Sequence, residues 1–214
     1  MTLLNINSSI GTPLAKQLRG GLLILGFLVS GLLFTLPIAA QTGTPTAAVQ
    51  SVVDSILVLL RKPDFDMAAD RPAISAAIKR AFDDTAMAQS VLSTNWRTAT
   101  PAQQTEFKAL LLKTIEGTYL GRIKAYTNQS VEYRGEEIRG NRATVNTVII
   151  AATGEIPVNY RLRQRSDGWF VYDVEVENVS MVNSYRDTYR DIVGRDGMDS
   201  LLEQMRAKLA EIEI

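Results

Sequence analysis

The spacing of hydrophobic residues changes twice along the chain, and this feature constrains the fold more than any other. Between about residues 47 and 126, apolar side chains recur every three or four positions, which is typical of amphipathic helices. From 129 to 177 they alternate with polar side chains, which is the period of half-buried strands. The helical spacing then returns up to about residue 211. Helices before and after an uninterrupted block of strands indicate an α+β fold.

The helical regions divide at their capping and breaking residues. The sequence predicts about six helices, over residues 47–62, 72–82, 84–96, 100–126, 178–193 and 197–211. The helix from residue 100 has the clearest start, because Thr100 can cap it, Pro101 suits the first helical position and Gln103 completes a capping box. Gly194 and Gly197 separate the last two helices.

The alternating region predicts a four-stranded antiparallel sheet. The strands cover residues 129–138, 142–153, 155–165 and 168–177, and they are joined by glycine-containing turns. In the last strand, one set of apolar side chains is expected to share a face: Phe170, Tyr172, Val174 and Val176. The opposite face is charged, so we expect a sheet packed on one side only, with the last helices returning to cover its apolar face.

The composition excludes many kinds of chemistry. The chain has neither histidine nor cysteine, so it has no Ser-His-Asp triad, cysteine nucleophile, usual zinc site or disulfide. Lysine plus arginine equals aspartate plus glutamate at 23 each, and no charge excess points to nucleic acid. The carboxylates of Asp83-Asp84, Glu136-Glu137 and the row formed by Asp173, Glu175 and Glu177 are interpreted as solvated or capping groups. We therefore expect no catalytic residue, metal or cofactor.

The first forty residues have the pattern of a secretory signal peptide. They carry only two charges, Lys16 and Arg19, followed by an uncharged apolar run over residues 21–36 and small residues before a polar segment. The sequence predicts cleavage after Ala40 and export. An uncleaved anchor is the alternative, because residues 20–40 are just long enough to span a bilayer. Residues 41–46 are predicted to be a flexible leader, and 47–214 a single domain.

The apolar stripes contain tyrosines as well as aliphatic residues. Tyr119 and Tyr126 lie on the long helix, Tyr160 and Tyr172 lie on strands, and Tyr185 and Tyr189 follow them. Two interpretations fit this pattern. The stripes can form an ordinary filled core, or they can line a deep cavity with tyrosine hydroxyls and arginines at its mouth, which would suit a lipid. Periodicity does not separate a filled core from a hollow one.

A series of short motifs extends over most of the domain, from about residue 47 to 210. In order they are Ala81-Phe82-Asp83, Met87-Ala88, Trp96, Ala99-Thr100-Pro101-Ala102-Gln103, Thr118-Tyr119, Trp169, Tyr172-Asp173, Val179-Ser180-Met181-Val182, Tyr185-Arg186 and Gly197-Met198-Asp199. In this combination the chain resembles the MlaC family, which includes toluene-tolerance proteins. It departs from the family pattern at Asp84, where many members carry an aromatic residue, and at Ser93, where glycine is common.

The resemblance implies a fold and a function. It implies a sheet wrapped by helices around an apolar cavity that takes the acyl chains of a phospholipid. It further implies a periplasmic carrier, without catalytic activity, in a system that maintains outer-membrane lipid asymmetry. The partners would be an outer-membrane lipoprotein complex and an inner-membrane ABC transporter with its lipid-binding ring subunit. The alternatives are a carrier of a hopanoid-like lipid, a ligand-free envelope adaptor and, more distantly, a carboxylate hydrolase.

On this interpretation the lipid site is formed by inward-facing positions on helices and strands. The residues expected to line the cavity are Val91, Leu111, Ile115, Tyr119, Val158, Tyr160, Leu162, Tyr172, Val174 and Met181. Tyr119 and Arg122 are expected at the cavity mouth, where the lipid headgroup would lie.

Overall fold

A computed structural model of the chain describes residues 43–123, 129–152 and 154–212. The predicted signal peptide, its cleavage after Ala40 and the alternative of an uncleaved anchor lie outside these residues. Within the described ranges, no helix combines the length and the hydropathy that a bilayer span requires. The predicted leader is shorter than expected, because Pro45 and Thr46 already belong to the first helix.

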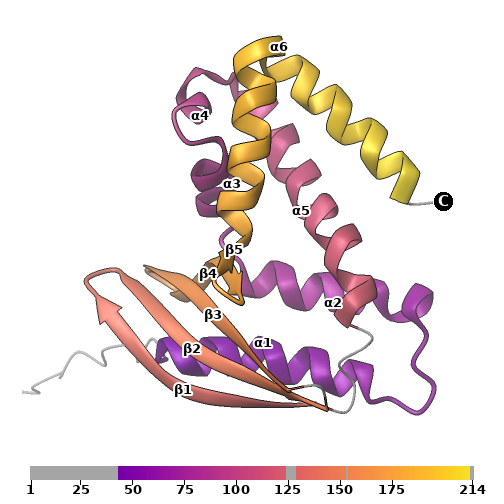
Figure 1. Ribbon diagram of the computed structural model, residues 1–214, viewed down its shortest axis with the longest axis vertical. Coiled ribbons are helices and arrows are strands. Elements are labelled where there is room, and N and C mark those ends of the chain that lie inside the picture. The colour runs from indigo at the N-terminus through magenta and orange to yellow at the C-terminus, as the bar shows by residue number, and fades with distance from the viewer. Residues whose placement is uncertain (1–42, 124–128, 153, 213–214) are drawn as a thin grey trace, which may run out of the picture. The chain divides into compact units, whose positions relative to one another are not determined.

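The α+β class is confirmed, with helices on both sides of a block of strands in the sequence (Figure 1). The helices before the sheet are α1 (Pro45–Leu60), α2 (Met67–Ala81), α3 (Asp84–Leu92), α4 (Asn95–Thr98) and α5 (Pro101–Ile123). The strands are β1 (Ser130–Arg139), β2 (Arg142–Ala151), β3 (Gly154–Arg165), β4 (Gly168–Val176) and β5 (Val179–Ser180). The last helix, α6 (Met181–Ile212), is interrupted at Gly197, where φ is 84° and ψ is 174°.

Side-chain caps determine where the helices begin. The predicted capping box is present at α5: the Gln103 backbone N–H donates to the Thr100 hydroxyl at 3.2 Å, and the Thr100 N–H donates to the Gln103 side chain at 2.9 Å. Helix α2 starts five residues earlier than predicted, because Asp66 caps it by accepting from the Ala69 N–H at 2.8 Å. Pro72 therefore lies inside this helix rather than at its start.

The predicted helix over residues 84–96 is two helices in the structure. Asp83 caps α3 by accepting from the Ala86 N–H at 2.8 Å. The helix ends at Leu92 because Ser93 adopts a φ of 52°, in the left-handed region that most residues avoid. The short helix α4 follows and includes Trp96.

The sheet is an antiparallel meander in the order β1-β2-β3-β4-β5. The four predicted strands are confirmed to within two residues at each end in the described part. Strand β5 was not predicted, because it has only two residues and follows a tight turn. In that turn Glu177 and Asn178 have φ values of 49° and 66°.

A register shift between β3 and β4 corrects one prediction. Arg161 pairs with Asp173 and Leu162 pairs with Val171, so Tyr172 is an extra residue in β4. An extra residue reverses the side-chain phase on either side of it. As a result Trp169 and Val171 are buried, whereas Phe170 and Tyr172 do not share the apolar face with Val174.

The apolar face of the sheet is covered by the first helix, not by the last ones as predicted. Helix α1 packs along the sheet (Figure 1). Between them lies a buried group that we call the sheet cluster, formed by Val49, Ala143, Val145, Leu162, Trp169 and Val171. The Glu136 carboxylate of β1 fixes the start of α1, because it accepts from the Thr46 N–H at 2.8 Å and from the Thr46 hydroxyl at 2.6 Å.

The last helix packs instead on α3 and α5. We call their shared core the helical cluster; it consists of Met87, Ala88, Val91, Leu92, Phe107, Leu111, Met181, Val182, Tyr189, Leu201, Leu202 and Met205. A smaller cluster of Leu60 and Ile74 joins α1 to α2. Phe82 and Val174 contact both the helical and the sheet clusters, and they connect the two cores.

Candidate lipid-binding site

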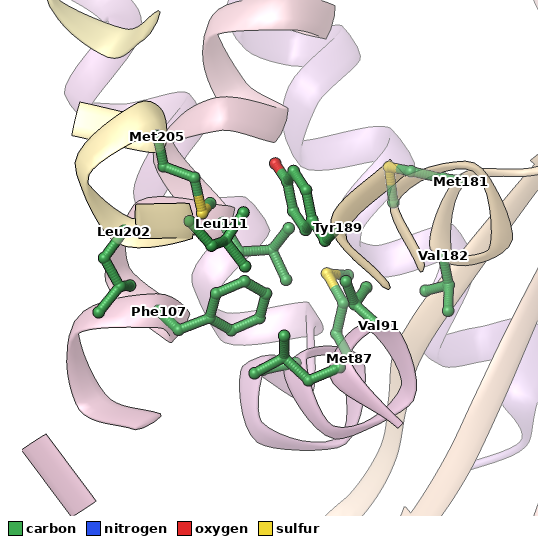
Figure 2. Close-up of a cluster of buried hydrophobic side chains, with 12 residues drawn as sticks. Met87, Val91, Phe107, Leu111, Met181, Val182, Tyr189, Leu202 and Met205 are labelled. Carbon is green, nitrogen blue, oxygen red and sulfur yellow. The ribbon is translucent and has the colours of Figure 1, made fainter. Parts of the chain in front are cut away.

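The helical cluster is the largest buried apolar group in the described residues. Figure 2 shows side chains from α3, α5 and α6 converging on Leu111 and Phe107, which are 1% and 0% exposed. Three methionines belong to the cluster: Met87, Met181 and Met205. Methionine side chains are unbranched and polarisable, and they repack more readily around an irregular partner than branched side chains do. The cluster therefore has the chemistry of a deformable apolar site.

Two tyrosines of α6 contribute to this cluster: Tyr189 is one of its members, and Tyr185 packs against it. The Tyr189 ring packs edge-on against Phe107, with 5.9 Å between ring centroids, and lies 5.6 Å from the Tyr185 ring. Burial raises the pKa of both hydroxyls above the ordinary tyrosine value, although hydrogen bonds with Thr114 and Thr118 of α5 lower it in part. Both tyrosines therefore stay neutral, which places uncharged hydroxyl groups beside an apolar core.

The sheet cluster has its own pair of tyrosines. Burial raises the pKa of Tyr133 to about 12, and the nearby Asp54 carboxylate contributes to the shift. Burial also raises the pKa of Tyr160, which lies close to Tyr133. The Tyr133 hydroxyl is buried without a hydrogen-bond partner among the described residues. A polar atom of this kind is uncommon in a core.

The structure brings one set of the predicted site residues together. Val91, Leu111 and Met181 lie within the helical cluster. Ile115 and Tyr119 of α5 pack against it. These five positions come from three helices, and their proximity follows from the packing of α3, α5 and α6. Their role as lipid contacts stays a prediction.

The other predicted site residues lie in different parts of the domain. Leu162 lies in the sheet cluster, Tyr160 packs against it, and Val174 contacts both clusters. Val158 is buried in β3. Tyr172 lies apart from both clusters and stacks with the Arg142 guanidinium, 5.6 Å from the ring centroid. Arg122 belongs to α5, but its side chain lies outside the described residues.

The surface that the structure describes includes two pockets that no predicted site residue lines. The larger, of about 600 Å³, lies between α1, the end of α2 and the β3–β4 turn. The smaller has a volume of about 270 Å³ and lies between α2, α5 and α6. Its lining residues are Arg71, Pro72, Ser75, Lys113, Glu116, Gly117 and Leu209. Apart from Leu209, these residues lie outside the apolar stripes from which the site residues were predicted.

One of the carboxylates singled out in the sequence, Asp173, has a structural role. Asp173 is 2% exposed, so of the two roles predicted for it, solvated or capping, it has the capping role. It accepts hydrogen bonds from the Ser180 hydroxyl at 2.6 Å and from the Val182 N–H at 3.0 Å, and thereby caps α6. Within the described ranges, no cluster of three or more acidic side chains is placed to hold a metal ion.

Comparison with known proteins agrees with this architecture. A family model described as "MlaC protein" matches residues 50–207. The chain is 23% identical over 205 residues to the intermembrane phospholipid transport system binding protein MlaC of Haemophilus influenzae, covering 91% of this chain and 95% of that protein. It is 28% identical over 189 residues to the toluene tolerance protein ttg2D of Pseudomonas putida, covering 85% of each.

A solved structure shares the fold. It is a phospholipid-binding protein from Ralstonia solanacearum in complex with a phospholipid. The two chains superpose with a TM-score of 0.75 at 21% sequence identity, over 80% of this chain and 100% of the other.

Proposed function

The chain belongs to the MlaC family, and from this premise we propose that it is a periplasmic carrier that binds a phospholipid by its acyl chains. The observation that carries the proposal is the family match, which extends from α1 into the last helix. The names of two relatives support it, since one belongs to a phospholipid transport system and the other is a toluene tolerance protein. The shared fold with a phospholipid complex adds to this support.

The helical cluster is the best candidate for the acyl-chain site. Each methylene group that leaves water gains about 0.8 kcal/mol, but the same chain gains little on leaving a bilayer, which is already apolar. A carrier therefore needs walls about as apolar as a membrane interior, and it needs side chains that move aside. The methionines and aliphatic residues around Leu111 meet both requirements. Uptake and release are then biased by contacts with partners.

We also propose partners for the carrier and a route of export. The carrier exchanges lipid with an outer-membrane lipoprotein complex and with an inner-membrane ABC transporter through its lipid-binding ring subunit. It reaches the periplasm by a cleaved signal peptide, and it performs no catalysis of its own. The name of the Haemophilus relative, which places that protein in an intermembrane transport system, supports this scheme.

Native mass spectrometry tests the proposal directly. Residues 41–214 are purified without detergent from a host that exports the full chain, and bound molecules are then extracted and identified. We expect a one-to-one adduct with the mass of a phospholipid, because a lipid bound by its acyl chains is retained when no detergent competes for it. A different apolar molecule in the extract would favour a hopanoid-like ligand. A bare protein that stays bare after incubation with liposomes would instead favour the adaptor.

A further inference from the structure

The pocket between α2, α5 and α6 lies beside the proposed acyl-chain site. Leu209 of α6 forms part of its wall, and Met205 of the helical cluster precedes Leu209 by one helical turn. On α5, Lys113 and Glu116 line the pocket and lie about 200° and about 140° around the helix from Leu111, so the pocket and the cluster meet at Leu209 of α6. A ligand whose apolar part enters the helical cluster past Leu209 would have its polar end near this pocket.

Three charged side chains line the pocket. Arg71 comes from α2, while Lys113 and Glu116 are three residues apart on α5 and so lie on the same side of that helix. Among the described residues, none of the three forms an ion pair or a side-chain hydrogen bond. Other charges nearby are paired: the Lys62 ammonium lies 2.6 Å from the Asp70 carboxylate, for example.

Glu116 gives the most specific indication of a ligand. Its Oε1 atom is buried and has no hydrogen-bond partner in the part of the chain that the structure describes. A buried carboxylate oxygen without a donor is unfavourable, and native structures usually provide one. A donor supplied by a ligand would satisfy this atom. The primary ammonium group is well suited, since it carries both a charge and N–H donors.

The other polar side chains of the pocket indicate which group accompanies the ammonium in the ligand. The Arg71 guanidinium and the Lys113 ammonium are both suited to phosphate oxygens, and the Ser75 hydroxyl can donate a further hydrogen bond. A volume of about 270 Å³ lies just below the range of pockets for drug-sized ligands, about 300–1,000 Å³, so the pocket holds a smaller group. These features together match a phosphodiester joined to a primary amine.

We propose that the pocket lined by Arg71, Lys113 and Glu116 binds the headgroup of an amine-bearing zwitterionic phospholipid and selects phosphatidylethanolamine over phosphatidylglycerol. This inference rests on the proposed carrier function and adds a headgroup preference to it. Arg71 and Lys113 bind the phosphodiester, which both lipids share. Glu116 accepts hydrogen bonds from the ammonium, which phosphatidylglycerol lacks, and so provides the discrimination.

The test measures the lipid loaded from vesicles of equal phosphatidylethanolamine and phosphatidylglycerol content. Delipidated residues 41–214 are incubated with these vesicles, recovered and extracted. We expect the wild-type protein to enrich phosphatidylethanolamine about tenfold over the vesicle ratio, the scale of one charged hydrogen bond. In Glu116→Gln the loaded lipids should match the vesicle ratio. In Lys113→Gln the loading of both lipids should fall.

The matched control is Glu106→Gln, the same change on the same helix. Glu106 pairs with Arg206 and does not line the pocket, so this variant should keep the wild-type preference. Equal lipid ratios in wild type and Glu116→Gln, with both proteins loaded, would overturn the headgroup assignment and leave the carrier function intact. No lipid in any sample would overturn both.

A second measurement separates a membrane lipid from its soluble headgroup. Delipidated protein is titrated with soluble glycerophosphoethanolamine and, separately, with inorganic phosphate. Weak binding of both, together with enrichment from vesicles, supports a lipid whose chains provide most of the affinity. Tight binding of the soluble compound without enrichment from vesicles would overturn the assignment to a membrane lipid.

Discussion

At the scale of a single residue, Asp173 is a carboxylate whose position in the strand pattern suggests a surface group but which is buried and stabilises the fold. Its two oxygens accept hydrogen bonds from the Ser180 hydroxyl and the Val182 N–H, which fixes the first turn of α6 to β4. The Arg161 guanidinium lies 3.8 Å from the carboxylate, which compensates part of the buried charge. The strand pattern places Asp173 on a polar face, but it cannot show that a helix begins above that face.

Replacing Asp173 by alanine should destabilise the protein. The variant leaves a buried hydroxyl and a buried N–H without their acceptor, and we expect a loss of about 2–4 kcal/mol in the free energy of unfolding. Urea denaturation of the delipidated protein measures it, since bound lipid would shift the apparent stability. Asp187→Ala, on the exposed face of α6, is the control and should change stability by less than about 0.5 kcal/mol. Equal midpoints for the two variants would contradict the capping role.

Leu111 lies at the centre of the helical cluster and tests whether that cluster holds acyl chains. In Leu111→Trp the larger side chain should occupy the space that a chain needs, at a cost of about 1–3 kcal/mol for overpacking. We expect the phospholipid adduct to be lost in native mass spectra while circular dichroism shows a folded protein. Ala109→Trp, an exposed position on the same helix, should keep its lipid. An unchanged lipid load in folded Leu111→Trp would show that the position does not contact the ligand.

At the scale of elements, Gly197 determines how α6 reaches the helical cluster. The break in the helix turns Leu201, Leu202 and Met205 towards α5. A φ of 84° with a ψ of 174° is accessible to glycine and strained for other residues. An added Cβ would meet no atom within 4 Å, so the effect of a substitution comes from the backbone alone.

Gly197→Ala should therefore lower the stability by about 1–3 kcal/mol. Gly194→Ala is the matched control, because Gly194 lies three residues earlier, is helical, and has equally open surroundings. There alanine favours the helix and should raise stability by up to about 1 kcal/mol. The two variants should thus shift the urea midpoint in opposite directions. Shifts of the same sign would show that the break does not depend on glycine.

The elements also show what a sequence pattern can and cannot predict. The capping box at Thr100, the turn glycines and the alternation in β3 are local signals, and the corresponding predictions are confirmed. The extra residue at Tyr172 is not local, because only pairing with β3 reveals it. It reverses the phase of β4, and for this reason Phe170 and Tyr172 were assigned to the wrong face.

At the scale of the described domain, packing partners were the hardest feature to predict. Hydrophobic periodicity shows that the sheet has an apolar face, but not that α1 rather than α6 covers it. The helical cluster was predicted in part, since Val91, Leu111 and Met181 come together there. The charged pocket was missed, because Arg71 and Lys113 lie on different helices and each looks like an ordinary solvated residue in the sequence.

The residues along the first strand determine whether the sheet can pair with another chain. In the described sheet β1 is an edge strand, and an open edge can pair with another chain and start aggregation. Here the edge carries charged residues along its length, including Glu132, Arg134 and Arg139, and its register shifts at Gly135. Charges and irregular pairing both discourage strand addition. Strand addition along β1 is therefore unfavourable, although β1 lies at the edge of the sheet.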